Sequence, residues 1–171
     1  MTRWLAVLPL AVLTALAILF ATYGLRHDPH VQPRALVGKP VPDLTLPALE
    51  DGRPVRLRAL TADGPVVINF FASWCAPCAE EAPALAALAA QRVRIVGVAY
   101  KDAPPKTQAF LNQLGDPYVQ RLVDRDGRAG IEFGVTGVPE TYLVGRDGRI
   151  LGKRAGPLQP ADVRALAVGS R

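Results

Sequence analysis

The two cysteines of this chain lie close together, in the segment Trp74-Cys75-Ala76-Pro77-Cys78. The pair falls where an apolar run ends and a helical pattern begins. At a helix N-terminus the unpaired backbone N–H groups and the helix dipole favour an anion, so the thiolate of Cys75 should be stabilised and nucleophilic. Cys78, one turn later, should face Cys75 and be the more buried of the two. This spacing predicts that Cys75 attacks a substrate disulfide and that Cys78 resolves the resulting mixed disulfide.

Three other uses of a cysteine pair fit this sequence less well. A disulfide that closes so short a loop constrains few chain conformations and stabilises the fold little. Structural zinc sites almost always use four protein ligands, and the two histidines, His27 and His30, lie far upstream of the cysteines. Covalent haem attachment requires a histidine directly after the second cysteine, where this chain has Ala79. We therefore expect a redox-active disulfide, with no metal and no cofactor.

Strand and helix patterns alternate around the cysteines. Residues 65–71 form an almost continuous apolar run, typical of a strand buried on both faces of a sheet. Residues 76–91 have small and apolar side chains at helical spacing, and Pro83 should kink this helix because it lacks a backbone donor. Further strands are expected over 93–99, 118–123, 140–144 and 149–153, further helices over 106–114 and 161–168, and an N-terminal β-hairpin over 41–49 and 55–60. This order predicts an α/β fold with a central mixed sheet flanked by helices on both faces.

The N-terminal segment has the length and composition of a transmembrane helix. No charged residue occurs between Trp4 and Leu25, and about 20 apolar residues suffice to cross the hydrocarbon core. A cleaved signal peptide is the alternative, but its apolar region usually spans only about 7 to 15 residues and ends at a small-x-small site. Here Ala15-Leu16-Ala17 lies inside the apolar run. We expect an uncleaved signal-anchor over residues 1–25, a tether over 26–34 and a single globular domain over 35–171.

Charge and composition narrow the function further. Half of the residues are hydrophobic and 20% are charged, which excludes disorder for the bulk of the chain. The formal net charge is +5, but the basic residues are scattered among acidic ones, so nucleic-acid binding is not expected. The charges around the anchor do not fix its orientation, because Arg3 on one side is matched by Arg26 and Arg34 on the other. The N-terminal place of the anchor and the redox chemistry favour a domain outside the cytoplasm.

Several motifs of this chain resemble the thioredoxin superfamily. Within it, the chain is similar to the DsbE/CcmG family of extracytoplasmic reductases of cytochrome c maturation, with the ResA/TlpA-like proteins as near relatives. The motifs that carry this resemblance are Trp74-Cys75-Ala76-Pro77-Cys78, Glu81 with Pro83, Tyr100-Lys101-Asp102, and the run from Gly134 to Thr141. The resemblance covers nearly all of residues 35–168 and implies a thioredoxin-like fold. It also implies that Pro139 is cis beside the cysteines and that Val138 offers backbone groups to an extended substrate chain.

The resemblance assigns roles to further residues. Asn69 stands six residues before Cys75, where thioredoxins carry a buried aspartate that moves protons, which an amide cannot do. Glu81 matches the acidic residue with proton-transfer duty in the ResA/TlpA-like relatives, although a helix-surface carboxylate could equally be a partner of the helix dipole. Glu140, next to Pro139, should lie at the rim of the site and discriminate among substrates by charge. Trp74 should both cap the thiols and pack against the domain.

Acidic residues near the cysteines predict the direction of electron flow. No basic residue lies between or beside Cys75 and Cys78, whereas Glu80, Glu81 and Glu140 are expected nearby. Acidic neighbours destabilise a thiolate, and a less stable reduced form makes the disulfide harder to reduce. A reductant is therefore expected.

The resemblance also implies a substrate, a partner and a location. The substrate is the disulfide between the haem-attachment cysteines of cytochrome c apoprotein, and the electron donor is a membrane thiol:disulfide transporter of the DsbD/CcdA type. The protein would be a single-pass protein of the cell inner membrane with its domain in the periplasm. The alternatives are a general ResA/TlpA-like envelope thiol reductase, a peroxiredoxin, which shares the pattern of residues 38–43 but needs a lone peroxidatic cysteine, and a chaperone that acts without redox chemistry.

Overall fold

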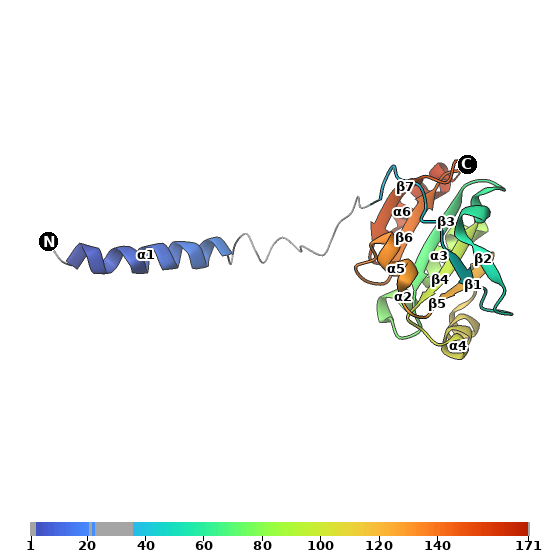
Figure 1. The fold of residues 1–171 in the computed structure, drawn as a ribbon, viewed down its shortest axis with the longest axis horizontal. Coiled ribbons are helices and arrows are strands. Elements are labelled where there is room, and N and C mark those ends of the chain that lie inside the picture. Colours follow the sequence, from blue (N-terminus) through green and yellow to red (C-terminus); the bar gives the residue numbers. More distant parts are fainter. Residues whose placement is uncertain (1–2, 21, 23–35, 171) are drawn as a thin grey trace. The chain divides into compact units, whose positions relative to one another are not determined.

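The computed structural model describes residues 3–20, 22 and 36–170, which belong to two compact units (Figure 1). The first unit contains helix α1 (Arg3–Leu19), in which the Thr14 hydroxyl donates to the carbonyl of Leu10. Among the described residues, no helix combines the length and the apolar character needed to cross a bilayer. The predicted anchor over 1–25 lies partly outside these residues, and the predicted tether over 26–34 lies wholly outside them.

The second unit is built on a five-stranded sheet in the order β5-β4-β3-β6-β7. Its strands are β3 (Val66–Phe71), β4 (Ile95–Tyr100), β5 (Gln120–Asp124), β6 (Glu140–Val144) and β7 (Ile150–Ala155). Strands β3, β4 and β5 are parallel, and β6 and β7 run antiparallel to their neighbours. Every residue of β3 is buried, so the prediction of a central, two-sided strand is confirmed. The predicted mixed sheet is also confirmed.

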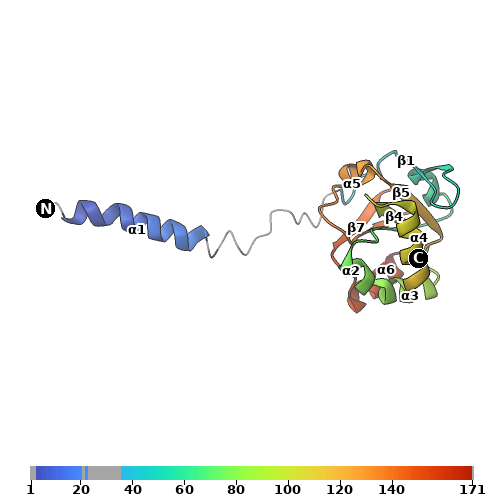
Figure 2. The same cartoon turned by 90° about the horizontal axis from the view of Figure 1, so that it is seen from below.

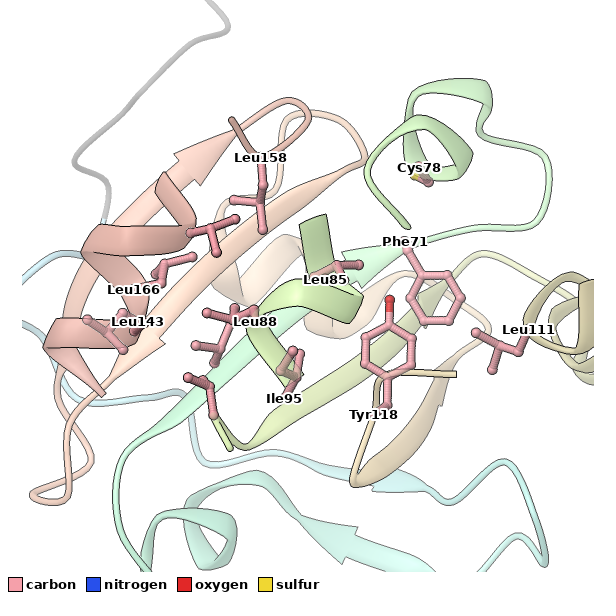
Figure 3. Close-up of a cluster of buried hydrophobic side chains, with 14 of the residues drawn as sticks. Phe71, Cys78, Leu85, Leu88, Ile95, Leu111, Tyr118, Leu143, Leu158 and Leu166 are labelled. Carbon is pink, nitrogen blue, oxygen red and sulfur yellow. The ribbon is translucent and has the colours of Figure 1, made fainter. Parts of the chain in front are cut away.

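Three helices cover one face of this sheet (Figure 2). The chain steps from β3 to β4 through α2 (Ala76–Glu80) and α3 (Ala82–Ala90), and from β4 to β5 through α4 (Pro104–Leu114). Because both steps go in the same direction across the sheet, α3 and α4 cover the same face, which α6 (Pro160–Gly169) completes. Figure 3 shows the core beneath them, to which α3 contributes Leu85 and Leu88, α4 contributes Leu111, α6 contributes Leu166 and the sheet contributes Ile95.

The opposite face of the sheet is covered by shorter elements. The predicted hairpin is confirmed with shorter strands, β1 (Thr45–Pro47) and β2 (Pro54–Arg56), followed by the 3₁₀ helix η2 (Leu57–Thr61). Helix α5 (Arg128–Phe133) was not predicted, because it has only six residues and is capped by glycines at both ends. Phe133 of α5 packs against Phe70 and Tyr142, whose ring centroids lie 5.1 Å from its own.

The helix after the cysteines is broken at Glu81, which confirms the kink predicted from Pro83. Pro83 has no N–H group to donate to the carbonyl four residues earlier, so the helical hydrogen bonds are interrupted there. A new helix begins after Glu81, because the N–H groups of Ala84 and Leu85 donate to the carbonyl of Glu81. Glu81 therefore ends α2 and begins α3.

Candidate active site

Cys75 and Cys78 form a disulfide at the start of α2, with an S–S distance of 2.04 Å. Cys75 is the N-cap residue, and its Sγ accepts a hydrogen bond from the backbone N–H of Cys78 at 3.1 Å. In this oxidised form Cys75 is 5% exposed and Cys78 is 2% exposed. The predicted helix start and the greater burial of Cys78 are confirmed. A helix N–H group directed at the sulfur of Cys75 favours its thiolate in the reduced form.

The loop before β6 lies directly against the disulfide. The peptide bond between Val138 and Pro139 is cis, and the carbonyl oxygen of Val138 lies 3.4 Å from Sγ of Cys75. Val138 and Pro139 thus lie beside the cysteines, and Pro139 is cis, as the family resemblance implies. Binding of a substrate chain by Val138 stays a prediction.

Trp74 flanks a hollow next to the nucleophile. Its side chain is among the exposed large hydrophobic groups, 60% exposed, and its indole N–H donates to the carbonyl of Lys101 at 3.3 Å. The expected packing role is therefore wrong for most of the ring, because the turn between β3 and α2 leaves it in solvent. The hollow has a volume of about 320 Å³ and is lined by Ser73, Trp74, Cys75, Ala76, Ala79, Phe110, Gln113 and Leu114.

Glu81, three residues after Cys78, is buried rather than lying on the helix surface, so the interpretation as a surface partner of the helix dipole is wrong. It is 1% exposed, because the break in the helix turns it toward the core. Its Oε1 accepts from Asn69 Nδ2 at 2.9 Å, and its Oε2 accepts from the backbone N–H of Leu158 at 3.2 Å. Burial raises the pKa of Glu81 to about 7, although the two hydrogen bonds oppose this shift. A carboxyl group with this pKa can take up and release a proton near neutral pH.

Asn69 holds Glu81 from the central strand. Its Nδ2 also donates to Thr141 Oγ1 at 3.0 Å, while its Oδ1 accepts from the hydroxyl of Tyr118 at 2.7 Å. Burial, with the negative charges of Glu81 and Asp116, raises the pKa of Tyr118, which keeps this hydroxyl a donor. The orientation of the Asn69 amide is therefore fixed from both ends. Sequence reasoning missed that Tyr118 and Thr141, which lie 49 and 72 residues away, are partners of Asn69, although Thr141 belongs to one of the motifs that carry the resemblance.

The prediction that Glu140 lies at the rim of the site is wrong. As the first residue of β6 its side chain points inward, where it is 1% exposed and pairs with Lys153 Nζ at 2.8 Å. Its Oε1 accepts from the backbone N–H and the hydroxyl of Thr136, in the loop that leads to Pro139. A buried, neutralised carboxylate cannot meet a substrate directly, so Glu140 supports this loop from below. Sequence reasoning missed Lys153, because a lysine in a strand is ordinarily exposed.

Comparison with known proteins agrees with this geometry. The family model described as Redoxin matches residues 36–167. The chain is 41% identical to the thiol:disulfide interchange protein DsbE of Allochromatium vinosum, covering 90% of this chain and 84% of that protein. It is 38% identical to DsbE of Escherichia coli, covering 94% and 89%. Among solved structures, a DsbE from Chlorobium tepidum is similar with a TM-score of 0.63 and 29% identity, over 76% of this chain and 92% of that one.

Proposed function

Because this chain belongs to the DsbE/CcmG family of the thioredoxin superfamily and is a thiol:disulfide oxidoreductase, we propose that it works as a reductant of disulfides in other proteins. The observation that carries this proposal is the position of Cys75 Sγ, which caps a helix and faces the Val138 carbonyl at 3.4 Å. A substrate chain bound along Val138 would bring its disulfide to this sulfur.

The reaction is a transfer of two electrons in two exchange steps. The Cys75 thiolate attacks one sulfur of the substrate disulfide, so that a mixed disulfide forms and the other substrate sulfur leaves as a thiolate. Cys78 then loses its proton and attacks Cys75 Sγ, which releases the second substrate sulfur. Glu81, buried three residues after Cys78 with a pKa of about 7, is the group we assign to accept that proton. The domain ends in the disulfide form described above.

The charges that remain around the disulfide support the reducing direction. Glu81 is buried on the same helical segment without an ionic partner of its own among the described residues, whereas Glu140 is neutralised by Lys153. An uncompensated carboxylate disfavours the thiolate form and makes the disulfide harder to reduce. Glu81, and not Glu140, is therefore the carboxylate that favours the reducing direction.

The reduction potential tests this direction. We expect a value nearer to the roughly −270 mV of thioredoxin than to the roughly −120 mV of DsbA. The full chain would be equilibrated with glutathione buffers and its thiols counted by alkylation. Replacing Glu81 by glutamine should raise the potential, whereas Glu80→Gln, at an exposed position, should change it much less. A wild-type value near −120 mV would reject the reductant.

As client we propose cytochrome c apoprotein, with the disulfide of its haem-attachment cysteines as substrate. A membrane thiol:disulfide transporter of the DsbD/CcdA type would return electrons to the domain. The support is the family resemblance in Tyr100-Lys101-Asp102 and in residues 137–141. A peroxiredoxin is not favoured, because the cysteine that would be the peroxidatic one pairs with a second cysteine in the same turn.

We further propose that residues 1–25 are a signal-anchor in the inner membrane, that 26–34 are a tether, and that the domain faces the periplasm. The absence of charge between Trp4 and Leu25 supports this arrangement. Carbonate washing of membranes should leave the full chain in the pellet. A full-chain variant with Leu13→Arg and Leu16→Arg, which places two charges in the apolar run, should be released. Release of the wild-type chain by carbonate would refute the anchor.

A further inference from the structure

Asp102 has a carboxylate that the reaction above does not use. It follows β4 and is 4% exposed. Its Oδ2 accepts from the backbone N–H of Ser73 at 2.7 Å and from Thr107 Oγ1 at 3.0 Å. Its Oδ1 accepts from the hydroxyl of Ser73 at 2.9 Å and from the N–H of Ala103 at 2.8 Å. All four partners donate, which is the arrangement that suits an ionised carboxylate.

Lys101, which precedes Asp102, binds Trp74, which follows Ser73 in the turn before Cys75. Lys101 has a left-handed backbone with φ +47°, which is uncommon for a residue other than glycine. Its carbonyl accepts the indole N–H of Trp74 at 3.3 Å, and its own N–H donates to the carbonyl of Asp124 at 2.9 Å. Two consecutive residues, Lys101 and Asp102, thus hold two consecutive residues, Ser73 and Trp74.

Ser73 and Trp74 depend on these bonds for their position. Strand β3 ends at Phe71, so both residues lie outside the sheet and directly before Cys75. Trp74 is 60% exposed and gains little from packing. The bonds to Asp102 and Lys101 fix this turn to the rest of the domain, and the N–H of Cys75 closes it by donating to the carbonyl of Ala72 at 3.2 Å.

Asp102 also joins the two walls of the hollow beside the nucleophile. Trp74 and Cys75 form one wall, and Phe110 and Leu114 of α4 form the other. Asp102 is bonded to the turn that carries the first wall through Ser73, and to α4, which carries the second, through Thr107. A shift of the turn away from α4 would change the width of this hollow.

We propose that Asp102 is a positioning residue, which locks the Ser73–Trp74 turn to α4 and so shapes the hollow beside Cys75 for an apolar side chain next to the substrate disulfide. This inference rests on the proposed function. The occupant is assigned to the substrate because the hollow is continuous with Cys75, and because none of its lining residues is charged. Within the part of the chain that the structure describes, the hydrogen bonds of the Asp102 carboxylate go to Ser73, Ala103 and Thr107 and not to the sulfur atoms.

The test compares a peptide disulfide with a small one. The reduced full chain would react with a disulfide peptide that carries an apolar residue next to a cysteine, and with 5,5′-dithiobis(2-nitrobenzoate). In Asp102→Asn one carboxylate oxygen, which accepts hydrogen bonds, is replaced by an NH₂ group that faces other donors. The Ser73–Trp74 turn should therefore loosen. We expect the half-saturating peptide concentration to rise about tenfold, because this is the loss of affinity expected from one broken charge-assisted hydrogen bond. The maximal rate with the peptide and the rate with the small disulfide should each change less than about twofold.

Asp124→Asn is the matched control. Asp124 is also a buried carboxylate that accepts two backbone N–H groups, from Ala129 and Gly130, but it makes no side-chain bond to Ser73 or Trp74. This variant should lose stability without the rise in half-saturating concentration. Ser73→Ala, which keeps the backbone bond to Asp102, should give a smaller rise than Asp102→Asn.

Three outcomes would overturn the inference. An unchanged half-saturating concentration in Asp102→Asn would show that Asp102 does not shape the hollow. An equal rise in Asp124→Asn would show a general effect of stability, and an equal loss with the small disulfide would show damage to the nucleophile. Failure of the wild-type chain to reduce either disulfide would instead refute the proposed function.

Discussion

Replacing Cys75 by serine should abolish disulfide reduction, with a loss of at least about a thousandfold, because a hydroxyl group cannot form the mixed disulfide. Replacing Cys78 by serine should leave the first attack intact and stop the reaction there. The geometry gives the physical reason. Cys75 is 5% exposed and its Sγ lies against the carbonyl of Val138, whereas Cys78 is 2% exposed. Single-turnover reduction of a peptide disulfide, with thiol release followed in time, measures both effects.

The halted reaction of Cys78→Ser also identifies the client. The stable mixed disulfide at Cys75 should be recovered from cells and its partner identified by mass spectrometry. Cytochrome c apoprotein is expected, and consistent recovery of a different envelope protein would favour the general reductase. Ala79→Ser, next to Cys78 on the same helix, is the control that should trap nothing. Equal trapping by Cys75→Ser would contradict the assignment of the nucleophile.

Replacing Glu81 by glutamine should slow the second step by roughly 10²- to 10⁴-fold, the range typical of a general acid or base. The wild-type carboxyl group ionises with a pKa of about 7, so the rate of resolution should rise with pH through this region. Glutamine has a similar shape but cannot accept the proton, so this rise should disappear. Stopped-flow measurement of mixed-disulfide decay between pH 5 and pH 9 tests the step. An unchanged pH profile in the variant would contradict the role of Glu81.

The same ionisation has a signature in stability. The pKa of Glu81 is raised from 4.5 to about 7 in the folded state, so between these values the folded chain binds more protons than the unfolded chain. The free energy of unfolding of the oxidised domain should therefore fall as pH rises from about 4.5 to 7, by roughly 3 kcal/mol, and the contribution should stay constant above pH 7. Urea unfolding at several pH values measures this change. Glu81→Gln should remove this slope, and Glu80→Gln should retain it.

The sequence by itself determined those features that arise from neighbouring residues. The unbroken apolar run of β3 requires burial on both faces, and the pattern after it requires a helix, so the cysteines had to lie at a strand-to-helix junction. The missing N–H group of Pro83 breaks that helix wherever the domain places it. The order of strands and helices likewise limited the fold to a mixed sheet with two covered faces.

Only the tertiary structure decided the environment of each polar side chain. Glu81 and Glu140 are both acidic residues that the sequence places beside the cysteines or beside Pro139, yet one is buried with a pKa of about 7 and the other is neutralised by Lys153. Their partners come from distant segments, as the bond between Glu81 and Leu158 across 77 residues illustrates. The local sequence around a carboxylate does not show whether it lies on an exposed surface, in a buried ion pair or in a proton-transfer site. Its role is set by desolvation and by the donors that the fold brings to it, and neither is encoded in adjacent residues.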